Sequence, residues 1–404
     1  MFSLPKDIVT PIPGGCNLSF NNNIAPYQIV SYNYDYIEVE SQPPSALGTS
    51  CPEDKIEVDM YHLFLKEYDN TVQTYFDGIE KMLTAESIKF HGRKVRADSG
   101  YYKYRRIYSS YRGTGEIFAV VATYNNRSTA YVSSVSYGCD LSNWEQCLEP
   151  VTGYWRLICA PLLILGVIIC FLGHRIFRFT LFVIGFTFGL LLTYLAISFD
   201  SHFAQDEKLI TSVVTGFFYG VIWVFIWWKF GIPFLSVHLN FILGGFLIAS
   251  VVFYSGLADL HPFTNSINYW ITFAALMIIC LIIWIPSAMH FHIFTCSLLG
   301  AYACVMALSY YWGGHLQYII INAFRRAVVN DFNVAIISPP FQIADILHCL
   351  LWAFLITVGC YVQLRHQWGK PPFPANRRGI LLANSVSERT PLIRSESLAV
   401  PQYV

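Results

Sequence analysis

Seven hydrophobic segments lie between Trp155 and Leu364, and each is long enough to cross a lipid bilayer. An α-helix needs about 20 predominantly apolar residues to span the hydrocarbon core. The core of a bilayer offers the backbone no hydrogen-bond partners, so such segments fold as helices. The sequence therefore predicts a seven-helix transmembrane bundle, with spans at residues 155–173, 176–198, 209–228, 230–254, 266–286, 289–312 and 342–364.

The charged residues lie mostly outside these segments. Of the 404 residues, 54% are hydrophobic and 13% are charged, whereas soluble proteins carry about 25% charged residues. The net charge is zero, so the charge balance predicts no nucleic-acid partner. We expect an extracellular or lumenal β-rich domain at 1–153, a seven-span transmembrane domain at 154–364 and a disordered cytosolic tail at 365–404.

The first of these domains contains several segments with strand-like composition, separated by Gly, Pro or Asn turns. Such a pattern indicates a β-sandwich-like domain. We expect its strands at residues 27–39, 55–65, 88–95, 101–111, 116–124 and 129–135. The segment from Asp69 to Leu83 is the one helical candidate, because Asn70 or Thr71 can cap it. Its apolar residues share one helical face: Val72, Phe76, Ile79 and Leu83.

The eleven cysteines fall into two groups. The even-numbered set in the polar domain suggests disulfides in an oxidising compartment: Cys16, Cys51, Cys139 and Cys147. These four allow three pairings, of which we favour Cys139–Cys147, a short loop, together with Cys16–Cys51. The other seven lie in hydrophobic segments, where cysteine acts as a small apolar packing residue.

Two glycosylation sequons, at Asn17 and Asn126, lie in the same polar domain. The distribution of Lys and Arg sets the orientation of a multispan protein. Arg175, Arg178, Lys229 and six Lys or Arg residues of the tail lie on one side of the predicted bundle. Sequons and basic residues thus agree on an N-terminus outside and a C-terminus in the cytosol.

Small residues at helical spacing predict close contacts between helices. Gly185 and Gly189 form one GxxxG pattern, and Gly216 and Gly220 form another. In the last outer loop, Leu316–Val329 has the pattern of an amphipathic helix at the membrane surface. The prolines of Ser338–Phe341 are expected to end it before the seventh span.

Polar residues within hydrophobic segments are candidates for function. Here they are few: His238 and Asn240 in the fourth span, and Asp345 and His348 at the start of the seventh. A channel or transporter with His238, Asn240 and Asp345 near its path is one alternative. A metal-dependent membrane hydrolase using Asp345 and His348 is a second. The sequence contains no phosphate-binding glycine loop or serine nucleophile elbow, and we expect no catalytic residues, metal or cofactor.

The tail carries the pattern ERTPLI, an acidic dileucine motif formed by Glu388, Leu392 and Ile393. Such motifs bind sorting adaptors that direct proteins to endosomes and lysosomes. Since the tail is rich in Pro, Ser and Arg, we expect the motif to be accessible. Apart from membrane lipid and this adaptor, the sequence does not identify protein partners.

An ordered set of motifs resembles the transmembrane 7 superfamily member 3 family. It comprises PIPGGCNLSF, FLGHRIFRFTLFVIGF, WWKFGI, TCSLLGAYACVMALSYYW, NAFRRAVVNDF, PPFQ and ERTPLI. The resemblance implies a plasma-membrane glycoprotein linked to cell survival and to attenuation of unfolded-protein stress. Family members carry a signal peptide and further ectodomain before the PGGC segment. Because MFSLPKDIVTPIPGG has no apolar core of that kind, we expect an N-terminally truncated or partial form.

Overall fold

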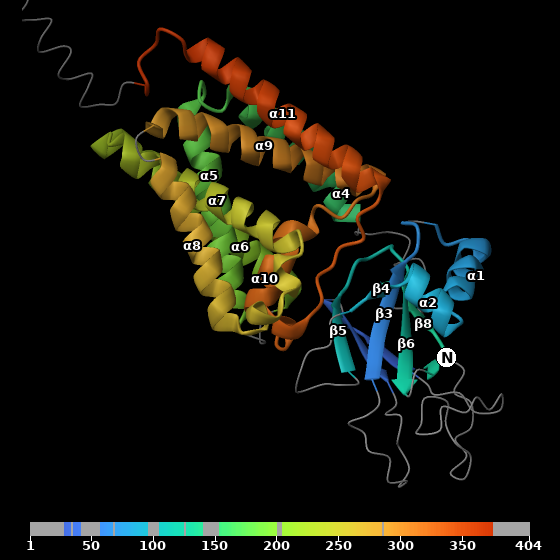
Figure 1. Ribbon diagram of the computed structural model, residues 1–404. Coiled ribbons are helices and arrows are strands. Elements are labelled where there is room, and N and C mark those ends of the chain that lie inside the picture. Colours follow the sequence, from blue (N-terminus) through green and yellow to red (C-terminus); the bar gives the residue numbers. More distant parts are fainter. Residues whose placement is uncertain are drawn as a thin grey trace, which may run out of the picture. The chain divides into compact units, whose positions relative to one another are not determined.

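The computed structural model describes residues 28–33, 35–41, 57–67, 69–95, 105–124, 127–139, 153–199, 204–284 and 287–374 (Figure 1). Several of the site residues expected from the sequence lie outside these ranges: Cys16, Asn17, Cys51, Asn126, Cys147, Glu388, Leu392 and Ile393. The disulfide pairing, the glycosylation sites and the sorting motif therefore stay predictions.

The chain forms two compact units. The first contains Met1–Leu163, Ala249–Ala274 and Val305–Leu351. The second contains Ile164–Ile248, Ala275–Cys304 and Trp352–Val404. Segments that connect hydrophobic helices form hydrogen bonds with the β-strands of the first unit. The three domains expected from the sequence stay a prediction.

The first sheet has three antiparallel strands in the order β1-β2-β5. Strands β1 (Gln28–Tyr32) and β2 (Tyr36–Ser41) form a hairpin, and β2 pairs with β5 (Arg105–Ser109). The single strand expected at 27–39 is therefore wrong. Asn33 and Tyr36 exchange backbone hydrogen bonds of 2.9 and 3.2 Å across the turn, and Asn and Asp are favourable turn residues.

The second sheet has the order β4-β3-β6-β7, and β8 also pairs with β6. Its strands are all antiparallel: β3 (Glu57–Phe64), β4 (Arg93–Lys94), β6 (Glu116–Tyr124), β7 (Arg127–Ala130) and β8 (Ser134–Ser136). Strand β6 is central, because it pairs with β3, β7 and β8.

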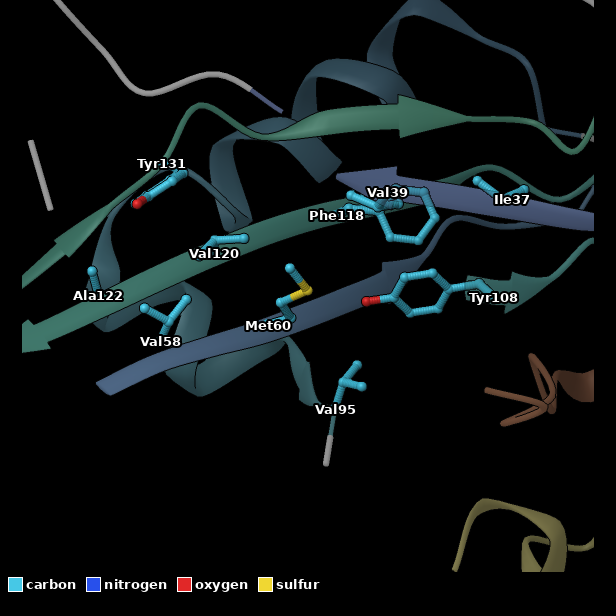
Figure 2. Packing of buried hydrophobic residues seen from close by; sticks show 10 residues of the cluster. All are labelled: Ile37, Val39, Val58, Met60, Val95, Tyr108, Phe118, Val120, Ala122 and Tyr131. Atoms are coloured by element: carbon cyan, nitrogen blue, oxygen red, sulfur yellow. The ribbon is translucent and has the colours of Figure 1, made fainter. Parts of the chain in front are cut away.

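The core of this domain lies between the two sheets (Figure 2). Ile37, Val39 and Tyr108 of the first sheet pack with Met60 and Phe118 of the second. Alternate residues of β6 face the other way, where they pack with side chains of two helices. Both faces of β6 are therefore buried. The expected β-rich, sandwich-like domain is confirmed, with helices added on one face.

Helix α1 (Val72–Lys81) lies where the sequence predicted a helix, and the side chain of Thr71 accepts a hydrogen bond from the Thr74 N–H at its N-terminus. Of the predicted apolar face, however, Val72 and Phe76 are exposed, as is Leu83 just beyond the helix. Gly78 and the half-buried Ile79 pack on the sheet instead. A Cβ at Gly78 would collide with Leu65 and Ile117. The absence of a side chain lets this face approach the sheet closely.

The strand expected at 88–95 is wrong, because the chain forms helix α2 (Ala85–His91) there. Thr84 caps the helix by accepting a hydrogen bond from the Ser87 N–H. Ile88 is the buried residue of this short helix. Of the predicted strand only Arg93–Lys94, as β4, is present. Side-chain capping by Thr84 favours a helix at this point.

A helix occupies each of the seven hydrophobic segments: α4 (Gly153–Leu172), α5 (Phe177–Ser198), α6 (Gln205–Phe230), α7 (Pro233–Tyr254), α8 (Ser266–Trp284), α9 (Ala288–Trp312) and α11 (Ile343–Gln367). Within the described residues, five contain stretches long and apolar enough to cross a membrane: Phe177–Ser198, Asp206–Phe230, Val237–Tyr254, Ala288–Trp312 and Ile343–Gln367. The other two contribute shorter apolar stretches, Ile158–Leu172 and Ser266–Cys280.

Short helices occupy two of the connections in the first unit. The 3-10 helices η3 (Leu257–Asp259) and η4 (His261–Thr264) lie between α7 and α8. Helix α10 (Tyr318–Val328) and the 3-10 helix η6 (Phe332–Val334) lie between α9 and α11. These connections supply most of the polar contacts described below.

In the second unit, the glycines of both GxxxG patterns lie where α5 and α6 touch. A Cβ added at Gly220 would lie 2.8 Å from the carbonyl oxygen of Phe182, and one added at Gly216 would lie 2.8 Å from that of Phe186. Gly185 and Gly189 face α6 at similarly short range. The two backbones can therefore approach only because these positions carry no side chain.

The exchange Gly220→Leu should separate α5 from α6 and lower the stability of the folded protein by about 1–3 kcal/mol, the usual cost of overpacking. The adjacent exchange Val221→Leu is the control, because Val221 is 47% exposed and its side chain has room to grow. The thermal unfolding midpoint of each purified variant in detergent measures the effect. Equal midpoints for the two variants would contradict a tight α5–α6 contact.

Candidate functional site

A buried polar network, here called the junction cluster, lies in the first unit. It consists of Glu67, Thr114, His315, Gln342 and Asp345. Glu67 and Thr114 belong to loops at the ends of β-strands, whereas the other three lie at or near the ends of α9 and α11. The cluster therefore joins the β-rich domain to residues that adjoin two long apolar helices.

His315 and Asp345 form the centre of the junction cluster, and both are 1% exposed. The His315 backbone N–H donates to Asp345 Oδ1 at 2.6 Å, and His315 Nδ1 lies 3.0 Å from Asp345 Oδ2. Since a carboxylate only accepts, Nδ1 carries a proton. On the other side of the ring, Nε2 lies 2.8 Å from the Thr114 hydroxyl. The imidazole is thus held from both sides.

Glu67 and Gln342 form the second half of the junction cluster. Glu67 Oε1 accepts a hydrogen bond of 2.8 Å from the Gly314 N–H and lies 3.8 Å from His315 Nε2. The side chain of Gln342 accepts from the Glu67 N–H at 3.0 Å and donates to the Leu65 carbonyl at 2.8 Å. This double contact fixes the chain that follows β3 to the residue that precedes α11.

Burial raises the pKa of the Glu67 carboxyl above its usual value, although His315 and the Gly314 N–H act in the opposite direction. The desolvation penalty therefore exceeds the stabilisation that these two neighbours give to the charged form.

A second polar group lies on α10. The Arg325 guanidinium donates to Asp35 Oδ1 at 3.1 Å through Nε, and through Nη1 to the Ser110 carbonyl at 3.0 Å and the Ser109 hydroxyl at 3.3 Å. Asn322, one turn earlier, accepts a 2.9 Å hydrogen bond from Ser109 Oγ. The helix expected at 316–329 is thus present, but its Asn322 and Arg325 side chains are buried against protein and do not lie on an open surface.

The loop after α10 is held to the edge of the first sheet. Ser109 donates to the Ile336 carbonyl at 2.9 Å, and the Ile336 N–H donates to the Ile107 carbonyl at 2.8 Å. Asp259 accepts from the N–H groups of Ile337 and Ser338 at 2.7 and 2.8 Å. The edge of β5, which would otherwise present unpaired backbone groups, is therefore covered.

Arg326 secures the same loop from the other side. Its guanidinium donates to the carbonyl groups of Phe332, Asn333 and Phe263, and it lies 4.6 Å from the ring centroid of Tyr269. Burial lowers the pKa of Arg326 to about 10, which still leaves the side chain charged near neutral pH.

The second unit contains a separate polar group. His174 Nδ1 lies 3.2 Å from His292 Nδ1, and the His174 N–H donates to the Gln363 side chain at 2.8 Å. The amide of Gln363 also donates to the Cys170 carbonyl at 2.8 Å. This group connects three hydrophobic helices and satisfies polar atoms at the turn between α4 and α5.

The polar residues expected from the sequence are divided between the units. His238 and Asn240 lie on α7 in the second unit, whereas Asp345 and His348 lie in the first. The buried Asn240 amide donates to Cys296 Sγ at 3.8 Å. His348 Nδ1 is buried with no hydrogen-bond partner in the part of the chain that is described. Among those same residues, no group of three or more His, Cys, Asp or Glu is arranged to hold a metal.

Sequence reasoning identified Asp345 but missed its partners His315 and Gln342 and the adjoining Glu67 and Thr114. It also missed the contacts of Arg325 in the second polar group. The cysteines of the hydrophobic segments are free: Cys159, Cys170, Cys280, Cys296, Cys304, Cys349 and Cys360. Cys139 is disulfide-bonded. The expected pairing of Cys139 with Cys147 stays a prediction, because Cys147 lies outside the described residues.

Comparisons with known proteins cover both parts of the chain. Residues 11–142 match a family model described as TM7SF3-like, second immunoglobulin-like domain, and residues 159–364 match the TM7S3/TM198-like domain. Proteins named Transmembrane 7 superfamily member 3 from Homo sapiens and Mus musculus are each 30% identical over 380 residues, which is 90% of this chain and 67% of the relative. No solved structure matches the chain significantly.

The exchange Arg325→Ala should leave the acceptors at Ser109, Ser110 and Asp35 without this donor and destabilise the first unit by about 1–3 kcal/mol. A larger loss is not expected, because the Asp35 side chain is 42% exposed and can be hydrated. Hydrogen exchange of β5 and α10 in the purified protein measures the effect. The control is Arg178→Ala, an exposed arginine. Unchanged protection of β5 in Arg325→Ala would contradict the role given to Arg325.

The exchange Glu67→Gln tests the effect of burial on ionisation. The raised pKa means that the folded protein binds more protons than the unfolded chain between the two pKa values. Stability therefore falls as pH rises through that interval, from about pH 4.5 upward. Glutamine keeps an oxygen for the Gly314 N–H but cannot ionise, so this part of the decline should disappear.

Thermal midpoints from about pH 4 to about pH 8, in lipid nanodiscs, measure this difference. Glu86→Gln, at an exposed position on α2, is the control and should keep the profile of the unsubstituted protein. If Glu67→Gln and Glu86→Gln have the same pH dependence, the Glu67 carboxyl does not contribute as described.

Proposed function

We propose that this chain, which belongs to the transmembrane 7 superfamily member 3 family, is a non-enzymatic interaction protein of the membrane. Its family membership confirms the resemblance found in the ordered motifs. Its five long apolar helices support integration into a membrane. The observation that carries the proposal is the junction cluster together with Arg325, because these buried contacts fix an immunoglobulin-like domain to the ends of α9 and α11.

Such an arrangement is better suited to passing a conformational change from the immunoglobulin-like domain to the helices than to catalysing a reaction. A partner that binds the immunoglobulin-like domain acts on β3 and β5, whose ends contact Gln342 and α10. Buried hydrogen bonds of this kind resist separation, since breaking them leaves polar groups without partners. A conformational change in the domain would therefore move the ends of the apolar helices, which a flexible linker would not do.

The proposal includes seven crossings, with the immunoglobulin-like domain outside and the tail in the cytosol. It also includes glycosylation at Asn17 and Asn126, residence in the plasma membrane, and an endosomal or lysosomal pool directed by the acidic dileucine motif. The placement of Lys and Arg supports the orientation. Protein partners of the outer domain would act in cell survival and in attenuation of unfolded-protein stress.

Both alternative functions require Asp345 to be available. A channel or transporter would have it near the path, and a metal-dependent hydrolase would use it together with His348. Both carboxylate oxygens of Asp345 accept hydrogen bonds, from His315 and from the Gln342 N–H. An ion path or a metal would have to replace these partners. This observation favours a structural role for Asp345 over the channel and hydrolase alternatives.

Rescue of cells that lack the endogenous protein tests the proposed function. Under a drug that causes unfolded-protein stress, the unsubstituted protein should restore survival. Arg325→Ala should restore less at an equal surface level, and Arg178→Ala should restore as much as the unsubstituted chain. Surface biotinylation separates loss of signalling from loss of folding.

Reconstitution into liposomes distinguishes the rivals. Ion flux or solute uptake that is abolished by substitution of His238, Asn240 or Asp345 would establish a channel or transporter. Stoichiometric zinc in the purified protein, lost in His348→Ala, would favour the hydrolase. Either result would overturn the non-enzymatic interaction role proposed here.

A further inference from the structure

Helix α1 exposes an apolar stripe that its own domain does not use. Val72 and Phe76 are one turn apart on α1, and Leu83 lies just after the helix, beyond its C-cap Met82; these three side chains are 71%, 61% and 62% exposed. Ile79, on the same side of the helix, is half-buried against the core. The opposite face, with Gly78 and the following Met82, packs against the sheet. An exposed stripe of this kind is more than a scattered surface residue and points to an interaction surface.

Two contacts place α1 at the end of its domain that adjoins the start of α11. Gly78 packs directly on Leu65. The Leu65 carbonyl accepts a 2.8 Å hydrogen bond from Gln342, the residue before α11. Only two contacts therefore separate the middle of α1 from the start of an apolar helix that is long enough to cross a membrane.

The surroundings of this point are also apolar and exposed. Trp312 ends α9, and Phe341 and Ile343 flank Gln342 where α11 begins, and all three side chains are exposed. Aromatic side chains at the ends of membrane helices mark the boundary between hydrocarbon and water. These exposed side chains fit a membrane boundary at the start of α11.

The charges on α1 and α2 indicate which lipid surface fits. The two helices carry three acidic residues, Asp77, Glu80 and Glu86, and two basic ones, Lys81 and Lys89. Polybasic surfaces bind anionic lipids, and this surface is not polybasic. A nearly neutral helix with an apolar stripe suits a layer of zwitterionic head groups.

We propose that the Val72, Phe76 and Leu83 stripe of α1 rests in the head-group layer of the membrane that α9 and α11 cross. The immunoglobulin-like domain is then supported by lipid as well as by the junction cluster. This inference rests on the membrane crossing included in the proposed function.

The same domain offers a matched control at its other end. Phe90 on α2 is 83% exposed. The adjacent Lys89 donates to Ser128 Oγ at 2.9 Å, and Ser128 pairs with Thr123, at the end of β6 opposite Glu116. The end of β6 that begins with Glu116 lies next to Thr114 of the junction cluster. Phe90 therefore lies away from the end at which Gly78 and Leu65 meet.

Photo-crosslinking from single positions tests the proposal. The full chain, with p-benzoylphenylalanine in place of Phe76, Phe90 or Leu350, is reconstituted into phosphatidylcholine liposomes and irradiated. Leu350, exposed on α11, reports whether that helix crosses the bilayer. Mass spectrometry should find lipid adducts at positions 76 and 350, and severalfold less at position 90.

The other outcomes contradict either the lipid contact of α1 or the membrane crossing of α11. Adducts at position 350 but none at position 76 would overturn the lipid contact of α1 and leave the membrane crossing intact. Equal adducts at positions 76 and 90 would show non-specific labelling and also overturn it. A crosslinked dimer from position 76 would assign the stripe to a second copy of the chain. Absence of adducts at position 350 would overturn the crossing itself.

Discussion

The buried guanidinium of Arg325 is the group on which the arrangement of the first unit depends most. It has five N–H donors and keeps its charge in a protein, so its removal from water is unfavourable unless acceptors are in place. Those acceptors come from the turn between β1 and β2, from the end of β5 and from α10 itself. The three segments therefore have to assemble together, and the sheet edge becomes attached to the chain between α9 and α11.

The junction cluster imposes a second constraint of the same kind at the start of α11. Here the His315 imidazole lies between the Asp345 carboxylate and the Thr114 hydroxyl. Burial raises the pKa of the neighbouring Glu67 carboxyl. Groups arranged in this way satisfy one another and leave little capacity for substrate or metal. The Gln342 contact to Leu65 also links α1 to the start of α11. Domain attachment and the proposed lipid contact are thus two consequences of one set of hydrogen bonds.

Local patterns in the sequence predicted some elements well and others poorly, for identifiable reasons. A run of about 20 apolar residues has few alternatives to a helix, and each of the seven runs contains one. In the polar domain, the helix after Thr71 was predicted, but α2 was not, because a strand was expected at 88–95. The apolar stripe of α1 was found, yet its exposure depends on Gly78, whose missing side chain turns the other face to the sheet.

The ordered motifs of the sequence resembled the family. The sequence by itself also predicted the apolar helices, the β-rich domain and the candidacy of Asp345, because composition, periodicity and an isolated carboxylate in an apolar segment are local properties. Only the tertiary structure decided which polar groups meet. Thr114 lies 201 residues from His315, and Asp35 lies 290 residues from Arg325. Glu67, Thr114 and His315 occur in polar stretches where such residues are ordinary. Their pairing follows from how the strands and the helix ends pack, which no local pattern encodes.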